Sequence, residues 1–521
     1  MKTLLIKLEP IVWGLFGAGM MVVALLMPAW LLVFGLAGPM DVLWTEALTY
    51  DRMLGLFGHP IGRLVGAVAI ALPLWAGAHH IRHLAIDFGG IARDTVIGPL
   101  CYAVALGGSV AAVLAVLALS QGDRLAGRPL EGLRILDLTR VVAGPFATAT
   151  LADLGAEVVK VERPGTGDDY RYGPSPKGET SLSFQNTNRG KRSITLDLRT
   201  PRGRELLLAL AERFDAIVEN FRAGWLDGQG LGPEVLQARN PRLVVASLSG
   251  FGQTGPRAGE PSYDIVAQAT GGLLAMTGFP GGPPVRGGGA LADFVGGLYL
   301  GLGIASALLE RERTGRARVL DLSNQDAIFA VTDSAASIHA GIEARTERVG
   351  NQHPFTAPYD AFEAVDGWVV IATASNKLFR QLCDALGRPE LATDERFRSH
   401  RGRAAHRAEI NEQLADWVRP RSCDDVLSTL GPAGADVPCA RVSAPEDLAS
   451  DPQLLAREMV ERHPHPTLGE VVFHGNPLRF SGAEPRALAL APELGADNAA
   501  VFGELGLDAA ELDQLREDGV V

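Results

Sequence analysis

The chain contains little cysteine, and its cysteines are scattered. Four occur among 521 residues, at Cys101, Cys383, Cys423 and Cys439, without a Cys-x-x-Cys pair. A disulfide framework or a thiolate metal site is therefore not expected, and a reducing compartment fits best. The chain also lacks a Walker loop and a Gly-x-Gly-x-x-Gly turn between a strand and a helix, so mononucleotide and NAD fingerprints are absent. We expect no metal and no permanently bound cofactor.

An excess of positive charge is also missing. The formal net charge is -12 at pH 7. Basic and acidic side chains balance within residues 1–120, so the negative charge comes from residues 121–521. Binding to a phosphate backbone requires a basic surface. Nucleic acid is therefore not expected as a partner.

Charged residues are absent from long stretches near the N-terminus. None occurs between Glu9 and Asp41 or within 95–120, and 64–78 with the flanking 53–62 forms a further apolar segment. About 20 apolar residues cross the hydrocarbon core of a bilayer. We therefore predict a bundle of three transmembrane helices. A cleaved signal peptide would show one short apolar core, and buried helices of a soluble domain are the remaining alternative.

A histidine-rich cluster follows the second of these segments. It consists of His79, His80, Arg82 and His83. His79 and His83 are four residues apart and would share one helical face. Haem or metal ligation and a polar cap at the membrane interface both remain open for them.

Three pieces of this N-terminal region carry a resemblance to a known family. They are Glu-Pro-Ile-Val-Trp-Gly-Leu-Phe-Gly-Ala-Gly (9–19), Leu-Thr-Tyr-Asp-Arg (48–52) and Leu-Pro-Leu-Trp-Ala-Gly-Ala-His-His (72–80). Over residues 5–120 the chain resembles the D subunit of fumarate reductase. The resemblance implies an inner-membrane anchor for flavin and iron–sulfur subunits, with quinone contacts at Trp13 and His80. The family has an arginine where this chain has His80, and Arg82 lies nearby.

The pattern changes after a polar linker at 121–129. Short apolar runs then alternate with helical segments, which predicts a Rossmann-like α/β domain with a parallel sheet and with ligands at the strand C-terminal ends. From about Tyr359 a hairpin and polar helices predict a second, smaller α+β domain. The predicted strands are 133–138, 157–161, 216–218, 243–248 and 319–322, and the predicted helices are 145–154, 202–213 and 507–515. The predicted domains are 1–120 (anchor), 130–345 with 466–521 (large) and 346–465 (small).

Side chains at three strand ends suit a phosphorylated ligand. Small residues in 139–145 let backbone N–H groups face a ligand at the start of a helix. Arg163 follows the next predicted strand, and 188–192 (Asn-Arg-Gly-Lys-Arg) forms a compact basic cluster. A solvated turn is the alternative interpretation of that cluster.

Asp293 lies just before a long apolar helix that is predicted to run to about Arg311. A carboxylate at a helix N-terminus is held ionised by the dipole, which contributes roughly 0.3–1 kcal/mol. The preceding Pro-Val-Arg-Gly-Gly-Gly-Ala (284–290) has few side chains, so a bulky substrate could approach. An ionised, approachable carboxylate can attack an activated acyl group. An ordinary helix N-cap is the alternative.

Five ordered pieces of residues 129–521 carry a second resemblance. They are Leu-Asp-Leu-Thr-Arg-Val-Val-Ala-Gly-Pro (136–145), Ala-Glu-Val-Val-Lys-Val-Glu-Arg-Pro (156–164), Asn-Arg-Gly-Lys-Arg-Ser-Ile-Thr-Leu-Asp-Leu (188–198), Val-Glu-Asn-Phe-Arg (218–222) and Thr-Gly-Arg-Ala-Arg-Val-Leu-Asp-Leu-Ser (314–323). They resemble the class III CoA-transferase (CaiB/BaiF) family. The resemblance implies that Asp293 is the nucleophile, that an acyl-CoA and a carboxylic acid are the substrates, and that two chains interlock as a homodimer.

The same resemblance implies further site residues. Where the family often has a basic residue, this chain has Gly228, so phosphate binding would depend more on Arg163 and the 189–192 cluster. The implied CoA contacts are Val142, Ala143, Arg163, Leu196, Asn220, Phe221 and Arg222. The implied substrate contacts are Tyr263, Gly288, Gly289, Gln352 and His353, with the N–H groups of 287–289 able to stabilise an oxyanion.

Two other functions remain open. A 2-methylacyl-CoA racemase would need a histidine where this chain has Tyr263, and a phenol is poorly matched to proton abstraction near neutrality. The chain could also be an anchor subunit with a passenger CoA-binding domain. Three spans place residues 1 and 121 on opposite sides of the membrane, and the anchor resemblance implies an inside N-terminus. Since CoA is cytosolic, we expect the transferase domain on the cytoplasmic side, which requires an inverted anchor or two separate proteins joined in one reading frame.

Overall fold

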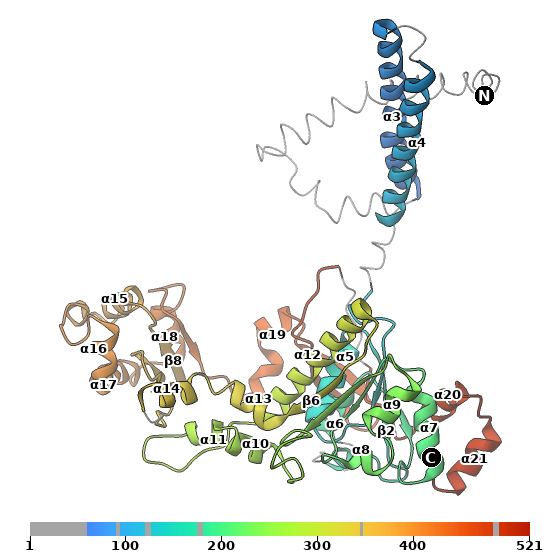
Figure 1. Cartoon of the computed structure of the whole chain (residues 1–521). Coiled ribbons are helices and arrows are strands. Elements are labelled where there is room, and N and C mark those ends of the chain that lie inside the picture. The colour runs from blue at the N-terminus through green and yellow to red at the C-terminus, as the bar shows by residue number, and fades with distance from the viewer. Residues whose placement is uncertain (1–59, 90–93, 120–126, 174–180, 344–346, 483–488) are drawn as a thin grey trace. The chain divides into compact units, whose positions relative to one another are not determined.

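The chain forms two units (Figure 1). The computed structural model describes residues 60–89, 94–119, 127–173, 181–343, 347–482 and 489–521. One unit comprises Met1–Pro129 with Phe480–Pro485, and the other comprises Leu130–Arg479 with Arg486–Val521.

The first unit contains a pair of packed helices, α3 (Pro60–Gly89) and α4 (Asp94–Leu119). The first predicted span (9–41) and Trp13 lie outside the described residues, so the three-helix bundle is not confirmed. Among the described residues, only α12 (Leu291–Thr314) of the other unit is long and apolar enough to cross a membrane, and the core helix of a soluble protein meets the same criteria. Within α4, Val96–Ala111 is a shorter apolar helix.

Aromatic and polar side chains join α3 to α4. The Trp75 indole donates to Ser109 Oγ at 3.2 Å, and His79 Nδ1 lies 2.8 Å from the Tyr102 hydroxyl. Arg82 donates to the same hydroxyl at 3.2 Å. Helix α3 continues through the histidine cluster to Gly89, so His79 and His83 belong to one helix. No group of three or more metal-binding side chains occurs in the described part of the chain.

The second unit is built on a six-stranded parallel sheet with the order β3-β2-β1-β4-β5-β6. The order reverses between β1 and β4, and ligands of doubly wound sheets bind at such a switch point, outside the strand C-terminal ends. All five predicted strands of the sheet are present, whereas β3 was not predicted. The strands are β1 (Arg134–Asp137), β2 (Glu157–Glu162), β3 (Arg192–Thr195), β4 (Ala216–Glu219), β5 (Val244–Ser249) and β6 (Val319–Ser323).

Helices cover both faces of this sheet. Because successive strand residues face opposite sides, Ile135 packs against α5 and α12, whereas Leu136 packs in the cluster of α7, α9, α20 and α21. The helices of this unit up to β6 are α5 (Ala143–Asp153), α6 (Leu182–Asn188), α7 (Pro201–Ala211), α8 (Trp225–Gly228), α9 (Pro233–Arg239), α10 (Asp264–Thr270), α11 (Leu273–Met276) and α12 (Leu291–Thr314). After β6 come α13 (Asn324–Ala330) and α14 (Ala335–Ile342), and near the C-terminus α20 (Asn498–Gly503) and α21 (Ala509–Glu517).

A three-stranded antiparallel sheet with its own apolar core follows α14. The hairpin predicted from about Tyr359 is present as β7 (Tyr359–Ala364) and β8 (Gly367–Ala372), and β8 also pairs with β9 (Cys439–Arg441). The hairpin of β10 (Val460–His465) and β11 (Gly469–His474) was not predicted. The helices of this region are α15 (Asn376–Ala385), α16 (His400–Ala405), α17 (Arg407–Val418), α18 (Cys423–Leu430) and α19 (Pro452–Ala456), with 3-10 turns η5 (Pro389–Ala392) and η6 (Pro445–Ser450). A further 3-10 turn, η4 (Asp169–Tyr172), lies between β2 and α6 of the parallel-sheet domain.

Candidate active site

Asp293 lies in the first turn of α12, and it does not cap that helix. The N-cap residue is Ala290, and no side chain of the N-cap forms a capping bond. Instead, Asp264 at the start of α10 accepts a hydrogen bond from the Ala292 N–H at 2.7 Å. The N-cap interpretation of Asp293 is therefore wrong, and its carboxylate is left for other contacts.

Burial determines the acidity of Asp293. Burial raises the pKa of Asp293 to about 6, the negative charge of Asp264 adds to this rise, and a hydrogen bond from Asn324 opposes it. The loss of hydration thus raises the pKa of Asp293 at a position where a helix dipole alone would lower it. The group is still ionised at neutral pH, since its pKa lies about one unit below 7.

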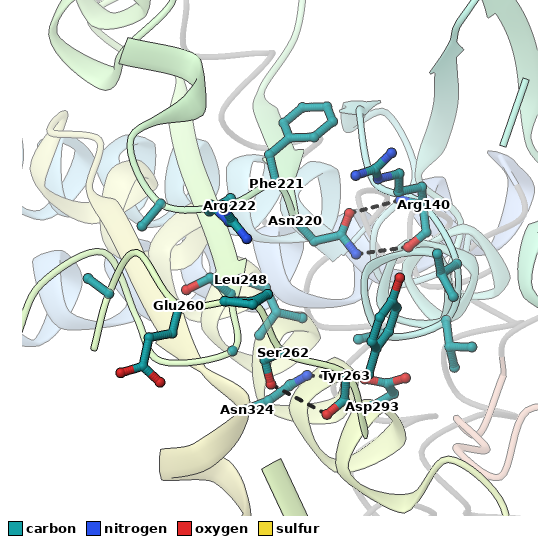
Figure 2. Close-up of a pocket in the computed structure, with 18 of the residues that line it drawn as sticks. Arg140, Asn220, Phe221, Arg222, Leu248, Glu260, Ser262, Tyr263, Asp293 and Asn324 are labelled. Carbon is teal, nitrogen blue, oxygen red and sulfur yellow. Dashed lines mark hydrogen bonds between the residues drawn. The ribbon is translucent and has the colours of Figure 1, made fainter. Parts of the chain in front are cut away.

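Asp293 lines a cavity of about 300 Å³ at the switch point of the sheet. Figure 2 shows this cavity between the β1, β4 and β5 ends and the N-terminal end of α12. Six of the other predicted site residues line it together with Asp293. They are Val142, Ala143, Asn220, Phe221, Arg222 and Tyr263.

A second cavity, of about 270 Å³, shares part of its lining with the first. Phe221 and Arg222 line both cavities, and Arg163 and Leu196 line the second. All seven residues predicted to contact CoA therefore line one or both of these cavities. The apolar walls of the second cavity include Leu198 and Trp225.

The amide of Asn220 ties the β1 end to the β4 end. The Arg140 N–H donates to Asn220 Oδ1 at 2.9 Å, and Asn220 Nδ2 donates to the Arg140 carbonyl at 2.8 Å (Figure 2). Arg140 lines both cavities, although the sequence did not single it out. The paired bonds fix the position of the two loops between which a ligand would lie.

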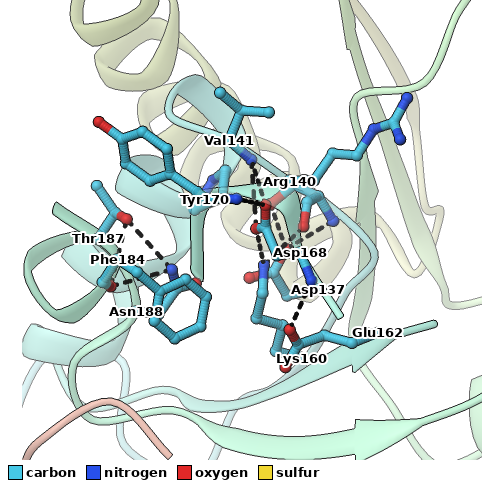
Figure 3. A network of polar contacts seen from close by, with 12 residues as sticks. Asp137, Arg140, Val141, Lys160, Glu162, Asp168, Tyr170, Phe184, Thr187 and Asn188 are labelled. Carbon is cyan, nitrogen blue, oxygen red and sulfur yellow. Dashed lines mark hydrogen bonds and ion pairs between the residues drawn. The ribbon is translucent and has the colours of Figure 1, made fainter. Parts of the chain in front are cut away.

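A strained residue, Val141, follows Arg140. Its φ is 70°, a left-handed conformation that is rare for a β-branched residue and costs about 1–3 kcal/mol. The Val141 N–H donates to both carboxylate oxygens of Asp168 at 3.1 and 3.2 Å, and Asp168 pairs with the buried Lys160 at 2.9 Å (Figure 3). Lys160 also donates to the Thr139 carbonyl at 2.7 Å. A buried ion pair thus holds the turn that lines the cavity.

The basic cluster at 188–192 does not face a ligand. Arg189 is buried and pairs with Asp153 at 2.6 Å, and Lys191 is buried and pairs with Asp137 at 2.8 Å. Arg192 is partly buried and pairs with Glu157 at 2.7 Å. The expectations that this cluster binds phosphate or forms a solvated turn are both wrong, because acidic side chains from the sheet and from α5 neutralise it.

Four predicted substrate contacts are absent from the linings of both cavities. Gly288 and Gly289 are exposed, and the N–H of Gly287 donates to Gln268 Oε1 at 3.0 Å. His353 is exposed, and its ring lies 5.4 Å from the ring of Tyr359. Gln352 immediately precedes it. Within one chain, the described residues therefore place Tyr263 with Asp293 but not the two glycines, Gln352 or His353. His80 is an exposed residue of α3 in the first unit.

Two buried polar residues of the site were missed. Asn324 Nδ2 donates to Asp293 Oδ1 at 3.1 Å. Glu219, at the end of β4, accepts a hydrogen bond from the Phe221 N–H at 2.7 Å, and burial raises the pKa of Glu219 to about 7. Asn324 directly follows β6, and Glu219 is the last residue of β4. The sequence could have indicated both residues only through their position near the C-terminal ends of two predicted strands, where ligands of such sheets bind.

Two family models match this chain. Residues 130–498 match the model described as CoA-transferase family III, and residues 6–117 match the model for the D subunit of fumarate reductase. The chain is 41% identical over 386 residues to acetyl-CoA:oxalate CoA-transferase of Acetobacter aceti, covering 74% of this chain and 97% of that protein. It is 37% identical over 397 residues to succinyl-CoA–D-citramalate CoA-transferase of Chloroflexus aurantiacus, covering 76% and 98%.

A human relative and a solved structure are also similar to this chain over most of its length. The chain is 34% identical over 403 residues to human succinyl-CoA:glutarate CoA-transferase, covering 77% of this chain and 92% of that one. The crystal structure of a CAIB/BAIF family protein from Brucella suis superimposes with a TM-score of 0.65 and 38% identity. That match covers 73% of this chain and 100% of the other.

Proposed function

This chain belongs to CoA-transferase family III, whose model it matches over residues 130–498, and we propose that it transfers CoA through covalent intermediates on Asp293. Family membership and the named relatives make it a CoA-transferase. The observation that carries the aspartyl mechanism is the cavity in which Asp293 lies together with Val142, Ala143 and Asn220. This cavity contains an ionised carboxylate, and its walls are formed by the loops at the switch point of the sheet.

The proposed reaction has four steps. The Asp293 carboxylate attacks the thioester carbon of the acyl-CoA, which forms a mixed anhydride and releases CoA thiolate. The thiolate attacks Cγ of Asp293, which forms an aspartyl-CoA thioester and releases the donor acid. The acceptor carboxylate then attacks the same Cγ and releases CoA thiolate, which finally attacks the acceptor acyl carbon and regenerates the Asp293 carboxylate. A carboxylate is a weak nucleophile, so positioning and exclusion of water supply much of the acceleration.

We propose that CoA lies along the two cavities. The nucleotide end would lie against the apolar walls of the second cavity, with Arg163 and Arg222 available to its phosphates. The pantetheine arm would pass Phe221 and the turn at 141–143 toward Asp293. Arg189 and Lys191 take no part in this proposal, since both are committed to buried ion pairs.

We propose a short dicarboxylic acid as the acceptor. The relatives compared above are named for oxalate, D-citramalate and glutarate, which are all dicarboxylates. Arg140 and Arg222 line the cavity of Asp293 and carry the positive charge that a second carboxylate would require. The other predicted substrate contacts are Gly288, Gly289, Gln352 and His353. They belong to this proposal only if loops or a second chain bring them to the cavity.

We further propose that residues 1–120 anchor the enzyme in the inner membrane, with the transferase domain in the cytoplasm. The match of residues 6–117 to the D subunit of fumarate reductase supports the membrane anchor. The cytoplasmic side is proposed because CoA is cytosolic, and it requires an inverted anchor or two separate proteins. Quinone contacts at Trp13 and His80, binding of fumarate reductase subunits and homodimer formation are parts of the same proposal. The domain limits 130–345 with 466–521 and 346–465 are proposed as stated above.

Trapping of the acyl intermediate tests the aspartyl mechanism. The full chain is incubated with acetyl-CoA, succinyl-CoA and other acyl-CoAs in the presence of hydroxylamine, and peptides are analysed by mass spectrometry. We expect a hydroxamate at Asp293 with the correct donor and none in Asp293→Asn, which should still bind CoA within several-fold of the wild-type affinity. A protein that binds CoA but gives no adduct with any donor would favour the passenger domain instead.

The racemase alternative has its own readout. A racemase would exchange the α-proton of a 2-methylacyl-CoA for deuterium without any acceptor acid. Because Tyr263 replaces the expected base, we expect no exchange. Exchange at a rate comparable to CoA transfer would reverse the assignment.

A further inference from the structure

Asn324 contacts the proposed nucleophile directly. It is the first residue of α13, immediately after β6, and its side chain is buried. Its Nδ2 donates to Asp293 Oδ1 at 3.1 Å, and Figure 2 shows the two side chains next to each other at the base of the cavity. Strand β6 and helix α12 thus bring an amide donor and a carboxylate together from positions 31 residues apart.

A glycine in α12, Gly296, makes room for this contact. An ionised carboxylate only accepts hydrogen bonds, so the NH2 group of Asn324 must face Asp293. The amide oxygen then lies above Gly296, where a Cβ would overlap it. Glycine one turn after Asp293 therefore makes room for the amide, and a larger residue at 296 would displace it from Asp293.

We infer that Asn324 is a catalytic residue that stabilises the oxyanion formed on Asp293 itself, an inference that rests on the aspartyl mechanism proposed above. In the second and third steps, Cγ of Asp293 is the electrophile. A new S–C or O–C bond forms at Cγ, and the electron pair of the carbonyl moves onto Oδ1. The pair then returns as the leaving carboxylate or thiolate departs, and no proton is transferred. Asn324 donates to the atom that bears this charge.

The hydrogen bond from Asn324 to Asp293 Oδ1 has a different effect in the first and last steps. In the first step Oδ2 attacks the donor, and Asp293 loses negative charge as the anhydride forms. A donor to Oδ1 then stabilises the carboxylate rather than the transition state, so it gives no acceleration. The last step is the reverse, because the departing Asp293 carboxylate regains its charge and shares it between Oδ1 and Oδ2. The two steps at Cγ are the ones in which a tetrahedral oxyanion forms on Oδ1 itself. Loss of one such donor typically slows a step about 10²–10³-fold.

A single-turnover experiment separates these steps. The full chain is mixed at pH 8 with the donor acyl-CoA and no acceptor, quenched with acid and digested with pepsin. Mass spectrometry then follows acyl-Asp293 and CoA-Asp293. In Asn324→Leu we expect acyl-Asp293 to form at the wild-type rate and to accumulate, while CoA-Asp293 forms about 10²-fold more slowly.

Two further variants control the result. Gln325→Leu removes a neighbouring amide, which donates to the Thr270 carbonyl at 3.1 Å and has no bond to Asp293, so both rates should match the wild type. Gly296→Ala keeps Asn324 but displaces its amide, and it should reproduce the accumulation of acyl-Asp293. Gly296→Ala carries the test if Asn324→Leu does not melt cooperatively.

The possible outcomes are distinct. Equal slowing of both adducts in Asn324→Leu would mean that Asn324 only positions Asp293, and unchanged rates would mean that its bond has no role. Either result overturns the inference. A wild-type chain that transfers CoA but never carries an adduct at Asp293 would instead refute the proposed mechanism.

Discussion

Two carboxylates share the N-terminal end of α12 and perform different tasks. Asp264 accepts hydrogen bonds from the Ala292 N–H and from Gln268, so its charge is used in capping. Asp293 accepts a hydrogen bond from Asn324 and lines the cavity. The sequence could indicate Asp293, because an acid before an apolar helix is visible in it. It could not indicate that Asp264, from another helix, would take over the cap.

The raised pKa of Asp293 predicts an acid limb in the pH–rate profile. The nucleophile is the carboxylate, which is present above its pKa of about 6 and is lost as the pH falls through that value. We expect kcat/KM to decrease tenfold per pH unit below about 6. Asp264→Asn removes a like charge that raises the pKa of Asp293, so the acid limb should move to lower pH. The amide oxygen of the new side chain can still accept from the Ala292 N–H, so the cap of α12 is preserved. A limb that stays at the same pH in this variant would contradict the role of Asp264.

At the scale of elements, α5 and α12 approach each other closely beside the site. A Cβ at Gly297 would lie 2.7 Å from the Ala143 carbonyl oxygen and 2.9 Å from the Phe146 ring. The Phe146 and Phe294 rings also meet edge to face at 4.9 Å between centroids. The distance between Asp293 and the turn at 141–143 thus depends on a glycine in α12.

Gly297→Ala should therefore weaken both stability and CoA binding. Overpacking of this kind costs about 1–3 kcal/mol, and we expect a lower melting temperature and a raised KM for the acyl-CoA. Gly301→Ala is the matched control, because its nearest neighbour would lie at 4.0 Å. That change should be neutral or slightly stabilising, since alanine favours a helix more than glycine does. Equal effects of the two substitutions would argue against a packing origin.

The turn at Val141 predicts a coupled pair of substitutions. Asp168→Asn removes the carboxylate that pairs directly with the buried Lys160, and loss of a buried partner typically costs about 3–5 kcal/mol. Asp137 and Glu162 lie near enough to offset part of that cost. The change also weakens the acceptor for the Val141 N–H. We expect thermal unfolding at lower temperature and a raised KM for the acyl-CoA. Glycine adopts a φ of 70° without strain, so Val141→Gly in the Asp168→Asn background should recover part of the KM. No recovery would mean that Asp168 does not hold the turn.

Five strands of the parallel sheet were predictable because each contains a short run of apolar, mostly β-branched or leucine residues. Strand β3 was missed because the basic residues 189–192 immediately precede or begin it. The acids that neutralise them, Asp153, Asp137 and Glu157, come from α5, β1 and β2. A sequence shows that a lysine is present, but only the tertiary fold shows which acid lies opposite it. For the same reason Asn324 was not identified as a neighbour of Asp293.

At the scale of the whole molecule, membrane association is the property to measure. We expect the 55.2 kDa chain to appear as one species in the membrane fraction of native cells. Detergent should release it, whereas high salt should not, because apolar spans rather than charges would hold it. Detection of a soluble fragment that begins near residue 121 would instead support two separate proteins, and release by salt would argue against insertion.

Helix α12 resembles a membrane span in length and composition, yet it belongs to the α/β unit, where 39% of its most apolar window is buried. If the first 120 residues are delivered to a translocon, the same machinery encounters α12 later during synthesis. The strands and α5 against which Leu300, Ile304 and Leu308 pack are almost all made before α12 emerges. In that case the order of translation would provide a folded sheet that competes with lipid for this helix, and packing on that sheet would keep Asp293 out of the bilayer.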